Sequence, residues 1–491
     1  MSAPIPTAGA AASAATARRS AAAFAARAAV AVADTHLRDA LANATDRLAT
    51  GRANQLAALP DPTALRAEAR AIRLKTLAAL DRYLDQFVAA ATRAGATVHH
   101  AATAAEATQI VARLARASGA GLVTKSKSMV SEEVGLNEAL ESAGVRVVET
   151  DLGEFIVQLA GDHPSHIIVP VVHRTRHEVA DLFRRTLGAK DEEVADIASM
   201  TALARRVLRR EFLEADVGIS GANFLVADTG TVCLVTNEGN GRMCTSVPRV
   251  HIVLAGIERV VPTLEDLGLL LQLLARSATG QALTCYTSLL TGPRRQHPDG
   301  TEPDGPDQMH VVLVDNGRRQ ILASEVAEIL ACIRCGACLN HCPVYRAIGG
   351  HAYGSVYPGP IGSVFTPAQS GFAHASALPH ASSLCGACRE VCPVGIEIPT
   401  LLLRLRARVE SRRAAPPWLR AGIAAFGATA SRPLLYRLAG RAMRWWSRLV
   451  ARNGWIGWLP GPLGGWTATR DFPAPAPRTF SERWRERRRP Q

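Results

Sequence analysis

Hydrophobic positions along the chain follow two different periods, and the period changes near residue 95. Before that point, apolar residues recur at helical spacing over residues 35–58 and 63–94, with Pro60-Asp61-Pro62 between them. This pattern predicts two helices. Residues 1–30 are of low complexity, and we expect the two helices that follow to form an N-terminal helical arm.

After residue 95, short β-branched runs alternate with amphipathic segments. The runs are residues 121–126, 145–151 and 166–172, and helix-like segments occupy 131–142 and 178–187. Such alternation is typical of βαβ units. We therefore expect a parallel sheet with helices on its faces.

Further along, the pattern predicts a β-hairpin whose turn is Asp228-Thr229-Gly230. The remaining expected elements are a helix at 192–213, the hairpin within 216–242, strands at 250–256 and 311–315, a helix at 264–276 and an exposed loop at 292–308.

The length of 491 residues allows two or three domains. With 48% hydrophobic and 20% charged residues, the composition is typical of a folded globular chain and excludes a disordered or collagen-like one. No uncharged apolar run reaches the roughly 18 residues of a spanning helix, and the start does not resemble a signal peptide. We expect a cytoplasmic protein, in which cysteines serve as metal ligands or buried thiols rather than disulfides.

The net charge of +13 is concentrated at one end of the chain. Residues 401–491 hold 19 Arg, no Lys and 4 acidic residues, and they also hold all 7 Trp. Because the rest of the chain is nearly neutral, we expect no nucleic-acid partner. This composition predicts a docking surface for the inner face of a membrane or for an acidic partner. An arginine-rich solvated tail whose Trp residues fill a local core is an equally good interpretation.

Seven of the ten cysteines lie between Cys332 and Cys392. The first group has two, two and three residues between its cysteines and ends in Pro343. This is the ferredoxin spacing, in which three thiolates hold one 4Fe-4S cube and the fourth reaches the other cube. A zinc site would not explain the Cys-Pro ending. The cysteines of this group are Cys332, Cys335, Cys338 and Cys342.

The second group, Cys385, Cys388 and Cys392, also ends in a Cys-Pro pair. Aligning the two endings places Ser382 opposite the first cysteine of the first group. The crossover rule then assigns Cys332, Cys335, Cys338 and Cys392 to cluster one, and Cys342, Cys385 and Cys388 to cluster two.

Cluster two is thus left with three thiolates. The fourth iron of cluster two could be bound by a residue elsewhere in the chain, or it could lack a protein ligand. Alternatively, cluster two could be a 3Fe-4S cluster. Ser382 is the candidate in register, although a helix-capping serine is as good an interpretation because a hydroxyl is a poor ligand. The remote candidates are Cys233, Cys244 and Cys285, each more typical of a small buried residue.

Helix-like segments at 324–333 and 397–410 flank the cysteine groups, as expected for clusters held between helices. Two clusters in series predict an electron-transfer path. No glycine-rich nucleotide fingerprint follows a predicted strand, so nothing in the sequence argues for a resident flavin or nicotinamide.

The chain resembles the iron-sulfur protein family of the bacterial lactate-utilisation system (LutB/LldF) over nearly its whole length after about residue 30. The segments that carry the resemblance are KSKSMVSEEVGLN at 125–137, VETDLGEFIVQLAGDHPSHIIVP at 148–170, GISGANFLVADTGTVCLVTNEGNGR at 218–242, the cysteine groups within 332–364 and 383–399, and GWIGWLPGPLGGWTATRDFPAPAP at 454–477.

The resemblance implies an α/β LUD domain, similar to sugar-isomerase and CoA-transferase folds, followed by a helical two-cluster ferredoxin-type module. It also implies that L-lactate is oxidised to pyruvate together with other subunits, by way of an electron acceptor that the sequence does not identify. The expected divisions are an arm at 1–60, the LUD domain at 61–318, the module at 319–412 and a basic Trp- and Arg-rich region at 413–491.

A second candidate site lies in the α/β part. Lys125 and Lys127 follow a predicted strand and precede a predicted helix start, where free N–H groups and ammonium groups could hold an anion. Glu238 and Arg242 flank glycines at the end of another predicted strand and could face the same pocket. A capped helix with solvated lysines and a plain turn are the structural alternatives.

The leading hypothesis is a non-catalytic electron-transfer subunit with two 4Fe-4S clusters in an L-lactate-oxidising complex. The alternatives are that the LUD domain itself binds or transforms a small carboxylate, or that it is a structural dock for partner subunits.

Overall fold

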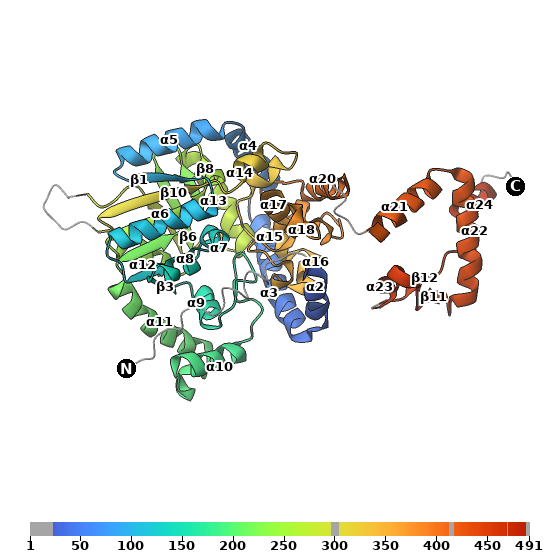
Figure 1. Cartoon of the computed structure of the whole chain (residues 1–491), viewed down its shortest axis with the longest axis horizontal. Coiled ribbons are helices and arrows are strands. Elements are labelled where there is room, and N and C mark those ends of the chain that lie inside the picture. The colour runs from blue at the N-terminus through green and yellow to red at the C-terminus, as the bar shows by residue number, and fades with distance from the viewer. Residues whose placement is uncertain (1–22, 296–303, 412–416, 469, 488–491) are drawn as a thin grey trace. The chain divides into compact units, whose positions relative to one another are not determined.

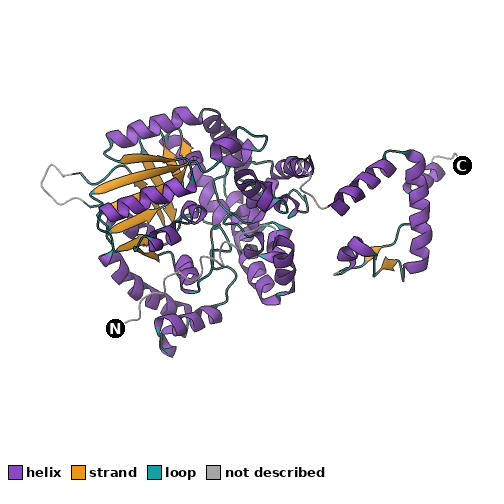
Figure 2. Cartoon of the chain, in the orientation of Figure 1, coloured by secondary structure: helices purple, strands orange, loops and turns teal. Residues whose placement is uncertain are grey.

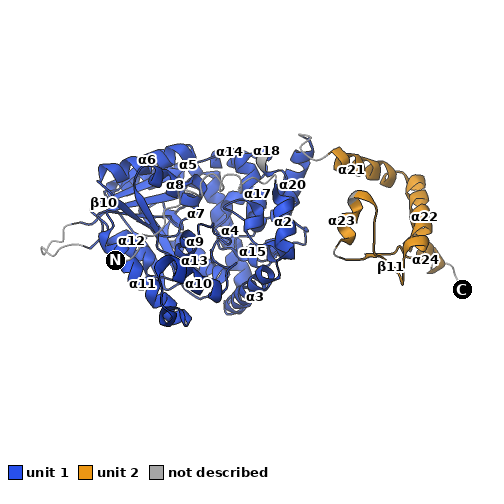
Figure 3. Ribbon diagram, turned by 60° about the horizontal axis from the view of Figure 1, so that its bottom comes forward, with its two compact units in different colours: residues 1–412 blue, residues 413–491 orange. Residues whose placement is uncertain are grey.

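The computed structural model describes residues 23–295, 304–411, 417–468 and 470–487. It forms two compact units, residues 1–412 and residues 413–491 (Figure 3). In the first unit, the strands gather in one half and the other half is helical (Figure 2).

The main sheet of the first unit has six strands, and every neighbouring pair is parallel. This confirms the predicted parallel α/β core, including the strands expected near 121–126, 145–151, 250–256 and 311–315. In spatial order the strands are β1 (Thr97–Ala101), β10 (Gln308–Val314), β7 (Val250–Gly256), β4 (Val217–Ser220), β2 (Leu122–Lys125) and β3 (Arg146–Glu149).

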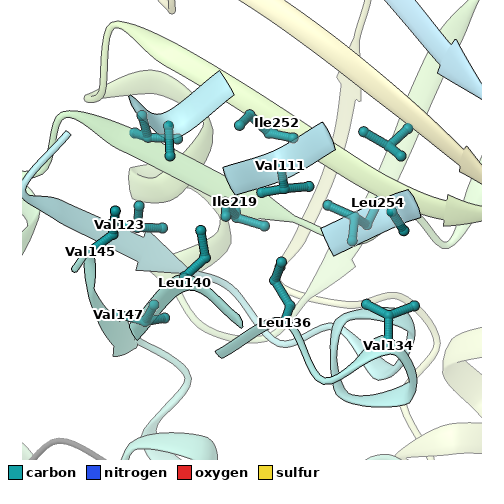
Figure 4. Packing of buried hydrophobic residues seen from close by; sticks show 14 of the residues in the cluster. Val111, Val123, Val134, Leu136, Leu140, Val145, Val147, Ile219, Ile252 and Leu254 are labelled. Atoms are coloured by element: carbon teal, nitrogen blue, oxygen red, sulfur yellow. The ribbon is translucent and has the colours of Figure 1, made fainter. Parts of the chain in front are cut away.

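Helices cover both faces of this sheet (Figure 1). On one face, α6 (Ala104–Ala117), α7 (Met129–Val134) and α8 (Leu136–Ser142) pack Val111, Leu136 and Leu140 against Val123 and Ile252 (Figure 4). The expected single helix at 131–142 is wrong, because Gly135 adopts a left-handed φ of 69° and divides it.

The opposite face is covered in two parts. Helices α9 (Leu152–Leu159), α10 (Arg176–Leu187) and α11 (Ile197–Glu214) pack near β2 and β3, and α5 (Leu80–Arg93) packs against β7 and β10. The expected helix at 192–213 is instead the 3-10 turn η3 (Asp191–Val194) followed by α11, which starts where Asp196 caps the backbone N–H of Ser199.

The predicted hairpin is confirmed in its centre only. Strands β5 (Phe224–Val226) and β6 (Thr231–Thr236) pair antiparallel around the expected turn. The residues before them form β4 of the main sheet, and those after them begin α12 (Asn240–Ser246). A second sheet is completed by β8 (Val260–Val261) and by β9 (Tyr286–Leu290), which the sequence pattern did not predict.

Both predicted helices of the N-terminal arm are present, and the second is divided into α4 (Pro62–Ala78) and α5. Asp61 caps α4 by accepting from the backbone N–H of Ala64 at 2.9 Å, with Pro62 at the first helical position. Helices α2 (Phe24–Ala33) and α3 (Thr35–Ala57) pack against the cysteine-bearing module, residues 318–411, and α3 also packs against α13 (Leu264–Ala278) of the α/β part. The arm therefore joins two parts of one unit.

The cysteine-bearing module consists of short helices. They are α14 (Arg318–Leu322), the turn η5 (Ala327–Ala331), α15 (Ala337–Asn340), α16 (Pro343–Ile348), η6 (His351–Tyr353), α17 (Gly359–Ser370), α18 (Phe372–Ala375), η7 (Leu378–His380), α19 (Ala387–Glu390) and α20 (Ile398–Ser411). The helix expected at 397–410 is confirmed as α20. The one expected at 324–333 is wrong, because only the 3-10 turn η5 forms there.

Residues 166–172, one of the predicted β-branched runs, form a buried loop rather than a strand. This loop is the seam between the α/β part and the cysteine-bearing module. The Tyr345 hydroxyl donates to the Ser165 carbonyl at 2.8 Å, and a Cβ at Gly350 would lie 1.8 Å from that same oxygen. The run is apolar because it is buried between two parts of the fold.

The second unit contains α21 (Pro417–Ala430), α22 (Pro433–Val450), α23 (Gly464–Thr467), α24 (Phe480–Arg487) and the short pair β11 (Trp455–Ile456) and β12 (Phe472–Pro473). Many of its large apolar side chains are exposed, including Trp445 and Leu449 of α22. Within the described residues, no helix combines the length and the apolar character needed to cross a bilayer.

Candidate metal centre

The two cysteine groups repeat one backbone conformation. Arg334 and Leu384 both have left-handed φ angles, 60° and 55°, and each is followed by a cysteine and a left-handed glycine. The backbone N–H of Arg334 donates to Cys332 Sγ at 3.3 Å, and that of Leu384 donates to Ser382 Oγ at 3.1 Å. Ser382 therefore occupies the position in the second group that Cys332 occupies in the first.

Cys332, Cys335, Cys338 and Cys392, here called the first thiol set, line one recess together with Ile167 and other apolar residues. Cys335 and Cys392 are buried. Burial and the neighbouring Cys332 and Cys335 raise the pKa of Cys338 well above its usual range. Four thiols that line one apolar recess are the kind of donor set that a 4Fe-4S cluster requires.

Cys342, Cys385 and Cys388 form the second thiol set. Burial, followed by the neighbouring Cys342 and Cys385, raises the pKa of Cys388 to about 12. Cys388 also acts electrostatically on Cys338, so the two sets adjoin. Cys385 is exposed at the surface, unlike Cys342 and Cys388.

Backbone N–H groups point at the sulfurs in both sets. Tyr345 N–H donates to Cys342, at the start of α16, and the N–H groups of Val394 and Ile396 lower the pKa of Cys392 against the effect of its burial. Hydrogen bonds to sulfur favour the anionic ligand and tune the reduction potential of an iron-sulfur cluster. All ten cysteines are free thiols, so no disulfide competes for these sulfurs.

A surplus of buried positive charge surrounds the first thiol set. Arg73, Arg259, Arg318 and Arg334 are buried, and the carboxylates among them are Glu133 and Glu258. Burial and Arg259 lower the pKa of Arg73 to about 10, whereas Cys332 acts in the opposite sense on it. A cube bound by four thiolates carries net negative charge, so these guanidinium groups fit such a cluster and would otherwise be poorly compensated.

Glu258 shows how unevenly the charges are matched. Burial alone would raise its pKa, but Arg318, Arg259 and Arg334 lower it to about 2. Only Arg318 is close, with Nε 2.5 Å from Glu258 Oε2; the nearest ion-pair distances to Arg259 and Arg334 are 3.8 and 3.6 Å. The Glu258 carboxylate is therefore the acidic neighbour of three guanidinium groups, and it forms a close ion pair with only one of them.

The helical arm holds the backbone of this region. Arg52 donates to the Val391 carbonyl at 2.7 Å, and Arg66 donates to the Cys392 carbonyl at 2.8 Å. Arg73 donates to the carbonyls of Val260 and Leu330 at 2.8 and 3.2 Å. These contacts fix the segments on either side of the first thiol set.

The remote cysteine candidates lie in elements of the α/β part. Cys233 is buried in β6 opposite Phe224 and Leu289, Cys244 is buried in α12 beside Thr150, and Cys285 is exposed next to β9. Each sits in or beside the sheets and α12, whereas the second thiol set lies in the helical module. Ser382 is the candidate that the backbone repeat favours.

The fold brings only two of the four residues of the expected anion site to one cavity. Lys125 is buried against Glu149 and Glu132, at 2.6 and 2.9 Å, and these carboxylates raise its pKa although burial alone would lower it. Lys127 and Glu238 line a cavity of the α/β part, whereas Lys125 and the exposed Arg242 are not among its lining residues. Lys125 is thus neutralised by the protein itself.

The arginines that surround the first thiol set were not predicted from the sequence. Arg66, Arg70 and Arg73 recur at helical spacing in α4, so a basic stripe on one helix face was the available signal. Nothing in the sequence indicated that Arg259 and Arg334 would meet at Glu258.

Comparison with known families divides the chain into three parts. Residues 84–314 match the LUD domain, residues 328–396 match the 4Fe-4S dicluster domain, and residues 409–489 match "Lactate utilisation protein B, C-terminal". The 4Fe-4S match spans both thiol sets.

Proteins named lactate utilization protein B from Shouchella clausii and Bacillus licheniformis are each 44% identical to this chain. The alignments cover 93% and 92% of this chain, and 95% and 94% of those proteins. The "Uncharacterized electron transport protein YkgF" of Escherichia coli is 42% identical over 90% of this chain and 92% of its own length. A solved duf162 family protein from Deinococcus radiodurans has a TM-score of 0.27 and 14% identity over 48% of this chain and 98% of its own, too distant to inform the fold.

This chain therefore combines a parallel α/β domain of the LUD type, a helical module with the ferredoxin cysteine spacing and a matching C-terminal region, and it aligns with these relatives over 90–93% of its length. The chain belongs to the lactate utilisation protein B family and is an iron-sulfur protein of the 4Fe-4S type.

Proposed function

We propose that this chain is the electron-transfer subunit of a complex that oxidises L-lactate to pyruvate, with one cluster held by each thiol set. The observation that carries the proposal is the pair of adjoining thiol sets, one enclosed and the other reaching the surface at Cys385. Iron-sulfur clusters supply one-electron transfer. The enclosed set faces the α/β part, and the exposed set offers a route to a partner.

In this proposal the protein contributes positioning and charge. The first thiol set would hold its cluster among Arg73, Arg259 and Arg334, whose positive charge favours the reduced form. The apolar walls of the recess, including Ile167 and Ile361, would exclude water from it. The second thiol set instead reaches the surface at Cys385, and solvent exposure also tunes the potential of a cluster. We therefore propose different potentials for the two sites.

The partners we propose are the other subunits of the lactate-oxidising complex, and the location is the cytoplasm. In α22, Arg437, Arg441, Arg444 and Arg448 follow helical spacing, with Trp445 and Leu449 exposed beside them. A helix of this kind suits an interface, and we propose that it docks on a partner subunit. Binding to anionic lipid vesicles instead would place the chain at the inner face of the membrane.

Anaerobic reconstitution of the full chain tests the proposal. We expect about eight irons per chain, or about seven if the second site holds a 3Fe-4S form, and electron paramagnetic resonance signals from two interacting clusters. Four irons or fewer in a folded chain would contradict two clusters.

The variants Cys335→Ser and Cys388→Ser, made in separate chains, compare the clusters of the first and second thiol sets. Each variant is expected to lose the signal of its own thiol set and keep the other. Loss of both signals from either variant, with the fold preserved by circular dichroism, would contradict separate sites.

A further inference from the structure

Three side chains of metal-binding type meet beside the seam loop at 166–172. Asp162 lies shortly before this loop, after the end of α9, and His173 follows the loop directly. His351 begins η6 of the cysteine-bearing module. One ligand atom from each of the three, two imidazole nitrogens and a carboxylate oxygen, lies within 4.8 Å of the other two. The α/β part therefore supplies two of these groups, and the module supplies the third.

The close approach of two backbones fixes the position of His351. The N–H of Gly350 donates to Ser165 Oγ at 3.2 Å, and a Cβ at Gly350 would lie 1.8 Å from the Ser165 carbonyl oxygen. Only glycine permits this approach. The next residue, His351, is thereby brought to the end of the seam loop, where its ring centre lies 4.5 Å from that of His173.

The distances among the three groups suit a single tetrahedral ion. His173 Nε2 lies 3.2 Å from Asp162 Oδ2, and His351 Nε2 lies 3.8 Å from Asp162 Oδ1. Two ligand atoms that each lie about 2.1 Å from a tetrahedral Zn²⁺ are about 3.4 Å apart. Small rotations of these side chains would therefore bring all three onto one ion.

The donor types select the kind of ion. Two imidazoles and one carboxylate are typical ligands of Zn²⁺ and of similar divalent transition metals, whereas Mg²⁺ and Ca²⁺ prefer oxygen ligands. The thiols of the two thiol sets suit iron-sulfur clusters instead. The group at the seam is therefore chemically distinct from both thiol sets.

Hydrogen bonds within the protein account for only part of this group. The His173 side chain is 10% exposed, and its Nδ1 is buried without a hydrogen-bond partner. Asp162 is held by Arg174 Nη2 at 3.0 Å and by the backbone N–H of His163 at 2.8 Å. His351 Nε2 donates to the His163 carbonyl at 2.7 Å, and a bound ion would replace this bond. A buried polar atom left unmet in this way is typical of a site whose ion or water is still to be added.

A cavity of about 160 Å³ adjoins two of the three groups. Asp162 and His351 line it, and its other charged lining residues are Glu132 and Arg27. This space is large enough for water molecules. Water would therefore complete the coordination of an ion that the protein binds with three ligands.

We propose that Asp162, His173 and His351 bind a divalent transition-metal ion of the Zn²⁺ type, which ties both ends of the seam loop to the cysteine-bearing module. An ion that binds only the folded arrangement stabilises it by mass action. Because its ligands come from two parts of the fold, this ion stabilises their contact in particular. The inference goes beyond the proposed function and uses none of the thiols.

The test adds Zn²⁺ to the anaerobically reconstituted full chain, followed by gel filtration and metal analysis. We expect about one Zn²⁺ per chain in addition to the iron. X-ray absorption at the zinc edge should show nitrogen and oxygen ligands at about 2.0–2.1 Å, without the sulfur ligands at about 2.3 Å that binding to the thiols would give. A chain that retains no zinc, or that binds it through sulfur, would overturn the inference.

Separate variants assign the ion to this site. His173→Gln and His351→Gln are each expected to bind Zn²⁺ at least tenfold more weakly and to lose the rise in thermal unfolding temperature that Zn²⁺ gives the native chain, with iron content unchanged. His177→Gln is the matched control, because His177 is exposed in the neighbouring α10 and lies outside the group.

Native affinity in both site variants, or an equal loss in His177→Gln, would also overturn the inference. The iron count reports on the clusters separately. A chain that binds Zn²⁺ at the seam but lacks iron would therefore contradict the proposed function and leave this site intact.

Discussion

At the scale of single residues, Ser382 decides what the second thiol set can hold. Its hydroxyl accepts the backbone N–H of Leu384 just as Cys332 Sγ accepts that of Arg334. The backbone therefore brings a side chain to the fourth ligand position, and only the identity of its terminal atom differs. A hydroxyl ionises far less readily than a thiol and is a weaker ligand for iron.

The exchange Ser382→Cys is expected to complete the second set, because it supplies a thiolate in the correct register. The iron content should then reach about eight per chain, and the second cluster should survive air exposure longer than in the native chain. Ser382→Ala is the control and should leave the iron content unchanged. Identical magnetic resonance spectra for Ser382→Cys and the native chain would show that this position does not face the iron.

At the scale of elements, the seam loop at 166–172 joins the α/β part to the cysteine-bearing module. His166 Nδ1 accepts the backbone N–H groups of Ile168 and Val169 at 3.0 and 3.1 Å, so its Nε2 carries the proton and donates to Asn340 at 3.1 Å. Burial and Lys127 lower the pKa of His166 to about 3. The folded seam therefore requires the neutral ring.

Acidification is expected to weaken the fold through this residue. In the unfolded chain His166 takes up a proton near pH 6.5, whereas in the folded chain it stays neutral to about pH 3. Its contribution to stability is thus present above pH 6.5 and is lost as pH falls toward 3, by at most about 1.4 kcal/mol per pH unit.

Urea unfolding at several pH values measures this effect. The variant His166→Asn should be less stable at pH 7 and should show a shallower fall below pH 6.5. Other histidines whose pKa is lowered by burial, such as His251 at about 3, contribute to the slope that remains in the variant. An unchanged slope in His166→Asn would contradict the assignment.

At the scale of the whole molecule, all seven clustered thiols and the arginines around them belong to the first unit, and residues 413–491 form a second compact unit. We therefore expect a chain ending at residue 412 to keep its iron content and spectra while losing its association with partner subunits. Co-purification with those subunits, compared with the full chain, measures the loss. Undiminished association would show that docking lies in the first unit.

The sequence by itself determined the parallel α/β core and the cysteine groups, because strand and helix periods and ligand spacings are local properties. It also determined the register of Ser382, since the two groups repeat over a short span. It failed at residues 166–172, where an apolar run is equally compatible with a buried strand and with a buried seam.

Only the tertiary structure decided which charges surround the thiols. Arg73 of the helical arm bonds to the carbonyls of Val260 and Leu330, far away in sequence, and Arg259 meets Arg334 at one shared carboxylate. The tertiary structure also places two carboxylates beside Lys125, which balance its charge. It leaves nitrogen atoms of Arg259 and Arg334 without hydrogen-bond partners. The physical reason is that the charge balance of a buried site depends on which side chains share it, and residue spacing along the chain does not record that.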